Sequence, residues 1–359
     1  MRAAVCLLAV TAGCAPAPRG AAYDVAFAQA ARAESAGRFE EGARDYDDAA
    51  SKAVRDRDRD QARWNAAEML VRAADYSDAA ARFAAIEADP KSEHRAEAAY
   101  RRAALGIDHG DPDRGWKAME DVARRYPSHG VSHVAVRRLV AHAAERGPDA
   151  AVAELGALGR DLASTELEEL VAFLDAETQE ARGNDEGARD AFVRIADRWP
   201  YPFGAFFDDA LWRASLLDEK AQRYQAAVDD LERMLKERET TFLVGSYERA
   251  LYVPAILRVG ALYRDRLNDH ARAREAFHRL YSDFTHSARR DEGLWLEAAL
   301  WREDGDDREA CARLATLMHD FPDSRYVPCA AGVCSGLERP KVSRAPNRCH
   351  EYIGRAPHD

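Results

Sequence analysis

The sequence predicts an all-α protein, a right-handed superhelix (α-solenoid) of about eight helix–turn–helix units. Three observations predict this fold class. One pattern of small and large apolar residues recurs from Tyr23 to about Ser324. No segment shows the sustained apolar–polar alternation of a half-buried strand. Alanine supplies much of the 47% hydrophobic content, so the core must be built by close helix packing.

The recurring unit places a small residue three positions after the turn and large apolar residues four and seven positions later. A clear copy begins at Gly305 and continues through Ala310, Leu314 and Leu317 to Pro322. The small residue lets the second helix approach the first, glycine in the turn supplies positive φ, and proline ends the second helix. The small positions are Gly42, Ala79, Gly115, Ala188, Ala227, Ala273 and Ala310.

The repeat length follows from equivalent turn residues, which begin at Phe39, Tyr76 and Pro112. Successive steps are 37, 36, 36 and 37 residues as far as Asp185, and then 39, 46 and 37. This pattern resembles the tetratricopeptide repeat, a helix–turn–helix of about 34 residues. Each hairpin has an uncovered apolar face, so the resemblance implies that the hairpins stack into one continuous solenoid.

The predicted organisation has six parts. A signal segment (1–14) and a flexible tether (15–22) precede six repeats (23–236), an insertion (237–253), two further repeats (254–323) and a cysteine-containing tail (324–359). The 46-residue step marks the insertion. It is either a longer helix or ordered loop at a bend, or a surface excursion without a role, because loops tolerate insertions.

The first fourteen residues have the layout of a bacterial secretory signal. Arg2 precedes an apolar run, and small residues then lead to Cys14. The ending Ala12-Gly13-Cys14 resembles a lipobox, which implies acylation of Cys14 and a lipid anchor as the only membrane contact. The expected location is the outer membrane, facing the periplasm. A plain cleaved signal and a cytosolic protein are the alternatives.

Four cysteines stand near the C-terminal end, at Cys311, Cys329, Cys334 and Cys349. An even number in an exported chain predicts two disulfides. If 324–337 is helical, Cys329 and Cys334 lie about 140° apart around the helix, which disfavours that pair. The other pairings stay open, and free buried thiols are an alternative. Zinc-type CxxC spacing is absent.

Other chemistry is not indicated. The formal net charge of −11 argues against nucleic acid as a partner, because phosphate binding needs a basic stripe. The sequence has neither a P-loop nor a GxGxxG motif. His129 and His133 are interpreted as surface histidines and not as metal ligands. We therefore expect no catalytic residues, cofactor, metal or small-molecule substrate, and no enzymatic activity.

The family resemblance implies that the inner face of each first helix lines a groove. Acids stand beside aromatic residues there, which suits an extended or helical peptide with apolar anchors and basic residues. The alternative is that the aromatics pack between adjacent first helices. The candidate groove residues are Phe27, Trp64, Tyr100, Phe173, Trp212 and Trp295, with Glu68, Glu177, Glu180 and Glu219.

Two sequence endings, Arg125-Tyr126-Pro127-Ser128 and Phe321-Pro322-Asp323-Ser324, carry a further likeness. They are similar to repeats of the outer-membrane barrel-assembly lipoproteins and the Tol–Pal-associated repeat proteins. The resemblance implies a non-enzymatic scaffold that binds envelope proteins or peptide segments. The alternatives are a helical accessory component of a cell-wall processing system, and a soluble adaptor.

Overall fold

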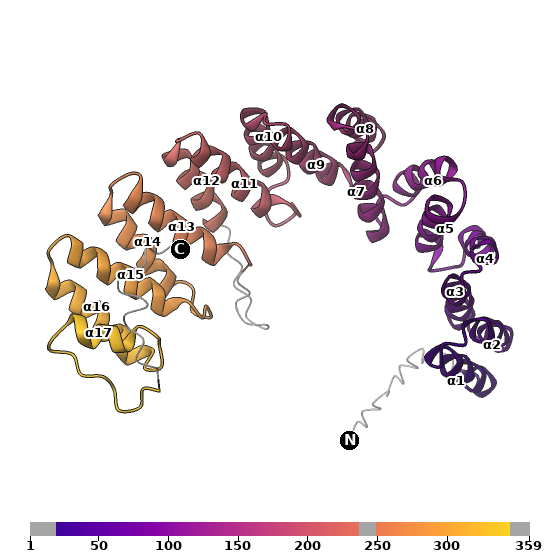
Figure 1. Ribbon diagram of the computed structural model, residues 1–359, viewed down its shortest axis with the longest axis horizontal. Helices are drawn as coiled ribbons and strands as arrows, with labels where there is room; N and C mark the ends of the chain where they lie inside the picture. The colour runs from indigo at the N-terminus through magenta and orange to yellow at the C-terminus, as the bar shows by residue number, and fades with distance from the viewer. Residues whose placement is uncertain (1–18, 237–248, 345–359) are drawn as a thin grey trace, which may run out of the picture. The chain divides into compact units, whose positions relative to one another are not determined.

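The computed structural model describes residues 19–236 and 249–344, and within these ranges it contains seventeen α-helices and no strand (Figure 1). The predicted all-α solenoid class is therefore confirmed. The chain divides between residues 168 and 169 into two compact units, which we call unit 1 and unit 2. Among the described residues, no helix combines the length and hydropathy that a membrane span requires.

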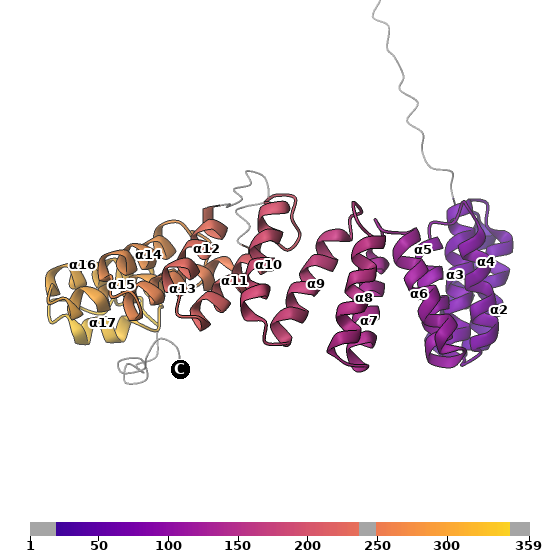
Figure 2. The same cartoon turned by 90° about the horizontal axis from the view of Figure 1, so that it is seen from above.

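Unit 1 consists of four helical hairpins, and Figure 2 shows its helices lying side by side. We call the first helix of each hairpin its A helix and the second its B helix. The pairs are α1 (Ala21–Ser35) with α2 (Phe39–Lys52), α3 (Asp56–Arg72) with α4 (Tyr76–Ala88), α5 (Arg95–His109) with α6 (Pro112–Arg125), and α7 (Gly130–Glu145) with α8 (Pro148–Asp161).

Unit 2 continues the same succession and ends with a short extra helix. Its pairs are α9 (Glu168–Ala181) with α10 (Asp185–Arg198), α11 (Phe207–Lys220) with α12 (Tyr224–Lys236), α13 (Tyr252–Asp265) with α14 (His270–Ser282), and α15 (Arg290–Glu303) with α16 (Asp307–Asp320), followed by α17 (Val327–Val333).

The small residues of the recurring unit lie where the two helices of a hairpin meet. At Gly115, an added Cβ would lie 2.5 Å from the backbone nitrogen of Ile107, so α5 and α6 approach too closely for any side chain. Ala79, Ala188 and Ala310 are fully buried. The large residues four positions later are buried as well, as at Phe192, and form the cores between hairpins.

Short polar side chains fix the starts of the B helices. Asp75, Asp111, Asn184 and Asp306 each accept a hydrogen bond from the backbone N–H three residues later. Such a cap satisfies one of the N–H groups that a helix start leaves unpaired. At Gly305 the backbone adopts a φ of 81°, which confirms the expected left-handed turn before α16.

The predicted segments at the chain ends and at the insertion fall largely outside the described residues. This applies to the signal segment with Cys14, to 237–248 of the insertion, and to 345–359 with Cys349. Helix α1 begins at Ala21, within the last residues of the predicted tether, and α17 lies within the predicted tail.

Candidate peptide-binding face

The predicted aromatic residues lie on A helices and pack against the B helix of the same hairpin. The ring centroids of Phe27 and Tyr46 are 5.1 Å apart, and those of Trp64 and Phe83 are 5.2 Å apart. In unit 2, Phe173 packs on Phe192 with centroids 5.4 Å apart. Phe173 is buried, whereas Phe27, Trp64, Tyr100, Trp212 and Trp295 are half-buried.

Several of these rings also contact the connection that leads to the following element. Trp64 stacks on His94 with ring centroids 5.0 Å apart, and Phe173 stacks on Phe206 at 4.6 Å. Trp295 stacks on Tyr326 at 5.0 Å, just before α17. The aromatic row therefore joins successive repeats, while the half-buried rings keep part of their surface open to a ligand.

The predicted acids are bonded to arginines of the following A helix. Glu68 binds Arg101 through both carboxylate oxygens, and one of these contacts measures 2.6 Å. The bond to Glu68 is the main cause that raises the pKa of Arg101. The sequence alone does not reveal the arginine partners, because each pair joins residues of different repeats.

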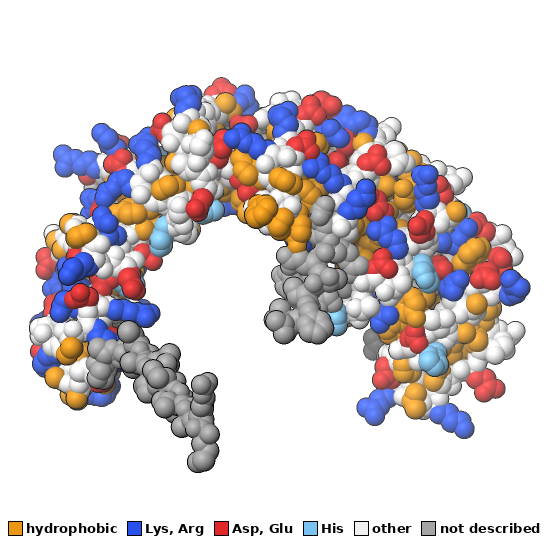
Figure 3. All heavy atoms as spheres, turned by 180° about the vertical axis from the view of Figure 1, so that it is seen from behind, with side chains coloured by type: hydrophobic (Ala, Val, Ile, Leu, Met, Phe, Trp, Pro, Cys, Tyr) orange, Lys and Arg blue, Asp and Glu red, His pale blue; other side chains and the backbone are white. Residues whose placement is uncertain are grey.

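The same pairing occurs in unit 2. Arg213 donates to Glu180 at 2.7 Å and lies 3.7 Å from Glu177, and Arg258 donates to Glu219 at 2.7 Å. Figure 3 likewise shows acidic and basic side chains intermixed over the visible face. The A-helix face is thus charge-balanced at the candidate acids, and does not offer the unpaired negative row expected for basic ligand residues.

Two hollows open on the A-helix faces, one in each unit. In unit 1, a hollow of about 470 Å³ brings together Trp64, Glu68, Arg72 and Arg101. In unit 2, a hollow of about 180 Å³ has an apolar floor rimmed by arginines. Its lining includes Trp212, Leu257, Arg258, Ala261, Phe277 and Leu296. The smaller hollow, in unit 2, is of the size of one large side chain.

Acidic residues that stand four positions before the aromatic residues of the A helices bind the connections between repeats. The sequence alone did not indicate this role. Asp60 accepts a hydrogen bond of 2.9 Å from the N–H of Glu93. Glu169 accepts bonds of 3.0 and 2.8 Å from the N–H groups of Ala205 and Phe206. Asp291 accepts a bond of 2.6 Å from Ser324. Each acid therefore fixes the connection entering the next element.

Asp208 occupies the same position in α11 but meets a different partner. Its carboxylate lies 2.5 Å from Arg249, the first described residue after 236, and its Oδ1 has no hydrogen-bond partner among the described residues. Burial raises the pKa of Asp208 to about 6, an effect that Arg249 partly offsets.

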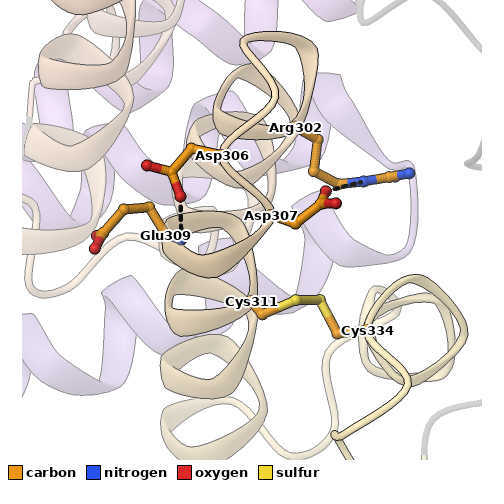
Figure 4. The surroundings of a disulfide bond; sticks show 6 residues. All are labelled: Arg302, Asp306, Asp307, Glu309, Cys311 and Cys334. Atoms are coloured by element: carbon orange, nitrogen blue, oxygen red, sulfur yellow. Dashed lines mark hydrogen bonds and ion pairs between the residues drawn. A yellow bond between two sulfur atoms is a disulfide. The ribbon is translucent and has the colours of Figure 1, made fainter.

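A disulfide joins Cys311 of α16 to Cys334 at the end of α17, with the two Cα atoms 5.8 Å apart (Figure 4). The expectation that Cys329 and Cys334 do not pair is confirmed. Cys329 is also disulfide-bonded, and Cys349 lies outside the described residues. In the described part of the chain, no group of three histidine, cysteine or acidic side chains could hold a metal ion.

Comparisons with known proteins concern the repeats. Residues 254–287, which include most of α13 and all of α14, match the family model of the tetratricopeptide repeat. No curated protein matches the sequence.

Solved structures with similar folds share little sequence with this chain. They include pilF of Pseudomonas aeruginosa, with 15% identity, a TM-score of 0.36, and coverage of 64% of this chain and 93% of that one. A tetratricopeptide repeat protein of Parabacteroides merdae has 13% identity, a TM-score of 0.33, and coverage of 77% and 99%. The apo form of RapI has 10% identity, a TM-score of 0.42, and coverage of 86% and 92%.

The family match covers one hairpin, and the other hairpins repeat its arrangement of small and large buried residues. Residues 254–287 are therefore similar to a tetratricopeptide repeat, and they are set among similar hairpins in an all-helical solenoid.

Proposed function

We propose that this protein is a non-enzymatic scaffold of the bacterial cell envelope, anchored to a membrane by acyl chains on Cys14. Its tetratricopeptide-repeat fold is one that binds proteins or peptides. The observation that carries the proposal is the pair of open hollows that contain Trp64 and Trp212 on A-helix faces.

The ligand we propose is a peptide segment of an envelope protein, anchored by apolar side chains. The floor of the unit 2 hollow includes Trp212, Leu257 and Phe277, which would contact such a side chain. Glu219 and Arg258 neutralise each other at its edge, so binding draws more on buried apolar area than on charge. A peptide held mainly by apolar contacts would bind with little dependence on salt.

The disulfide supports the envelope part of the proposal. Disulfides persist in oxidising compartments such as the bacterial periplasm and are rare in the cytosol. The bond between Cys311 and Cys334 therefore favours export over a soluble cytosolic adaptor. Counting free thiols in protein purified without reductant tests this point, because a cytosolic protein would have reduced cysteines.

Filling the unit 2 hollow tests peptide binding. Ala261 lines the hollow and is half-buried, so Ala261→Arg adds bulk there without removing a core side chain. Affinity purification from solubilised envelopes with mass spectrometry should recover partners with the wild type and lose them with Ala261→Arg and Trp212→Ala. Trp116→Ala, on α6 in unit 1, is the control. Equal recovery by all variants, with circular dichroism showing retained helix, would contradict the groove.

The anchor is tested separately. Cells given radiolabelled palmitate should label the wild-type protein, and Cys14→Ser should abolish the label and release the protein from membranes. A labelled Cys14→Ser protein, or an unlabelled wild type, would refute the lipid anchor.

A further inference from the structure

The connection between α10 and α11, residues 199–206, exposes apolar side chains. We call it the aromatic loop; its sequence is Trp-Pro-Tyr-Pro-Phe-Gly-Ala-Phe, without a charged residue. Phe203 is 88% exposed, whereas the other exposed large hydrophobic residues of the described chain are all valines. Pro200, Pro202 and Ala205 are exposed too. Figure 3 shows hydrophobic side chains gathered on this face over the α10–α11 connection.

Contacts with α9 and within the loop hold the aromatic loop in one conformation. Glu169 is buried and accepts hydrogen bonds from the backbone N–H groups of Ala205 and Phe206. An added Cβ at Gly204 would lie 1.9 Å from the carbonyl oxygen of Trp199, so the loop closes too tightly for any other residue. Phe206 stacks on Phe173 in the core. Phe203 is therefore exposed on a fixed support.

Five backbone donors of the loop are bonded within the chain. Pro200 and Pro202 have no N–H to donate. The carbonyl oxygen of Pro200 accepts bonds of 3.1 Å from both Phe203 and Gly204. The donors bonded within the chain are those of Trp199, Phe203, Gly204, Ala205 and Phe206.

This arrangement suits a lipid surface better than a protein pocket. A specific protein interface carries about one hydrogen bond per 100–200 Å², and the exposed side chains of Pro200, Pro202, Phe203 and Ala205 can make none. Contact with hydrocarbon requires that N–H groups be satisfied internally, as those of Phe203, Gly204, Ala205 and Phe206 are. Tryptophan, tyrosine and phenylalanine are also the side chains that favour the boundary between lipid and water.

Two arginines lie over aromatic rings of the loop. The guanidinium carbon of Arg198 lies 4.6 Å from the ring centroid of Trp199, and that of Arg249 lies 5.1 Å from the ring of Tyr201. Arginine bonds well to phosphate oxygens, and stacking keeps its apolar face covered. Arg249 also pairs with the buried Asp208 at 2.5 Å, so Arg198 is the cation placed to meet a phosphate headgroup beside the apolar side chains of the loop.

We propose that the aromatic loop is a second membrane contact, which inserts Phe203 into the interface of a phospholipid bilayer. This contact adds to the lipid anchor and does not depend on it. One inserted ring with its neighbours binds weakly and reversibly, as a single lipid chain does. It orients unit 2 on a surface to which the protein is already held.

The test uses the chain from Ala15 onward, which contains every described helix and the whole described core, beginning at Tyr23. Because this chain lacks Cys14, the result does not depend on acylation. Because only purified protein and vesicles are present, it does not depend on a protein partner either. Sedimentation with phosphatidylcholine vesicles should give a measurable partition coefficient. Phe203→Asp should lower it by about tenfold or more, and Phe203→Trp should retain it. Val25→Asp, at an exposed position of α1, should leave it unchanged.

A second readout locates the contact. Vesicles with brominated acyl chains should quench part of the tryptophan emission of the wild type, and Trp199→Phe should remove that quenching while preserving the partition coefficient. Equal partition of the wild type and Phe203→Asp would overturn the proposal. Sedimentation of the wild type without quenching of Trp199 would also overturn the proposal. The exposed loop would then be explained by insertion into a pocket of a partner protein.

Discussion

At the scale of single residues, unit 2 buries carboxylates that have incomplete partners. Asp230 is 8% exposed, its Oδ2 lacks a hydrogen-bond partner in the described part of the chain, and Arg189 lies 3.9 Å away. Burial raises the pKa of Asp230 to about 6, and Arg189 offsets this only in part. The unfolded state has the usual pKa of 3.8. The folded state therefore binds a proton more tightly, and stability rises as the pH falls from about 6 to about 4.

Replacing this charge should stabilise the protein at neutral pH. We expect Asp230→Asn to raise the free energy of unfolding of unit 2 by about 3 kcal/mol near pH 7, because the pKa differs by about two units between the states and each unit corresponds to about 1.4 kcal/mol. The gain should vanish at about pH 3, where Asp230 is protonated in both states. Urea unfolding at the two pH values measures it, and Asp229→Asn, at an exposed neighbour, is the control. An equal effect at both pH values would contradict the assignment.

The first-turn acids show what sequence reasoning can miss at this scale. Asp60, Glu169, Asp208 and Asp291 each stand four residues before Trp64, Phe173, Trp212 and Trp295. This spacing is visible in the sequence, but the partners of the acids are not. Asp60, Glu169 and Asp291 bind a connection about 33 to 37 residues later, and nothing local indicates that contact.

At the scale of helices, close approach within a hairpin limits which residues can be tolerated. Gly115 and Gly156 both lie inside helices, yet their surroundings differ. A Cβ at Gly115 would overlap the backbone of α5, whereas at Gly156 its nearest neighbour would be the Arg160 side chain at 3.7 Å. The same substitution should therefore have opposite effects at the two positions.

We expect Gly115→Ala to lower the free energy of unfolding of unit 1 by about 2 kcal/mol, since a packed core accommodates an extra methyl only by shifting helices. Gly156→Ala should raise it by up to about 1 kcal/mol, because alanine favours helix over glycine. Urea unfolding followed by circular dichroism measures both. A neutral Gly115→Ala would mean that α5 and α6 separate easily.

Most of the helical framework could be predicted from local sequence, whereas the face of the solenoid could not. Residues such as Ala79 and Phe83 are four apart on one helix, so their spacing predicts a hairpin core directly. The bond between Glu68 and Arg101 joins two A helices, and its arginine has no distinguishing neighbours in the sequence. The charge balance of the candidate groove therefore required the three-dimensional structure. The pairing of Cys311 also stayed open for this reason.

At the scale of the whole molecule, α17 ends the array. It packs on α15 and α16 and covers Leu294, Leu314 and Leu317 with Val327 and Ala330. A terminal repeat would otherwise expose this apolar face. The disulfide from Cys311 to Cys334 holds the seven-residue helix there.

Removing this bond should loosen the end of unit 2 selectively. It closes a 23-residue separation, and loops of this size contribute about 3 kcal/mol when bridged. We expect the double variant Cys311→Ser, Cys334→Ser to exchange backbone hydrogens faster in α15 to α17, measured by mass spectrometry. Helices α3 and α4 of unit 1 serve as the internal control. Unchanged exchange in α17 would mean that packing alone holds the cap.

The arginine–glutamate pairs between A helices also bear on how such a chain can evolve. Helix α3 supplies Arg72 to the preceding hairpin and Glu68 to the following one, and α11 does the same with Arg213 and Glu219. In α11 the arginine stands one residue and the glutamate seven residues after Trp212, and Glu180 likewise stands seven residues after Phe173. A gene segment that encodes the α11–α12 hairpin could therefore be copied in tandem, and each new arginine would meet a glutamate of the preceding copy. Ancestral lengthening of the array by such duplication would leave neither ion without a partner.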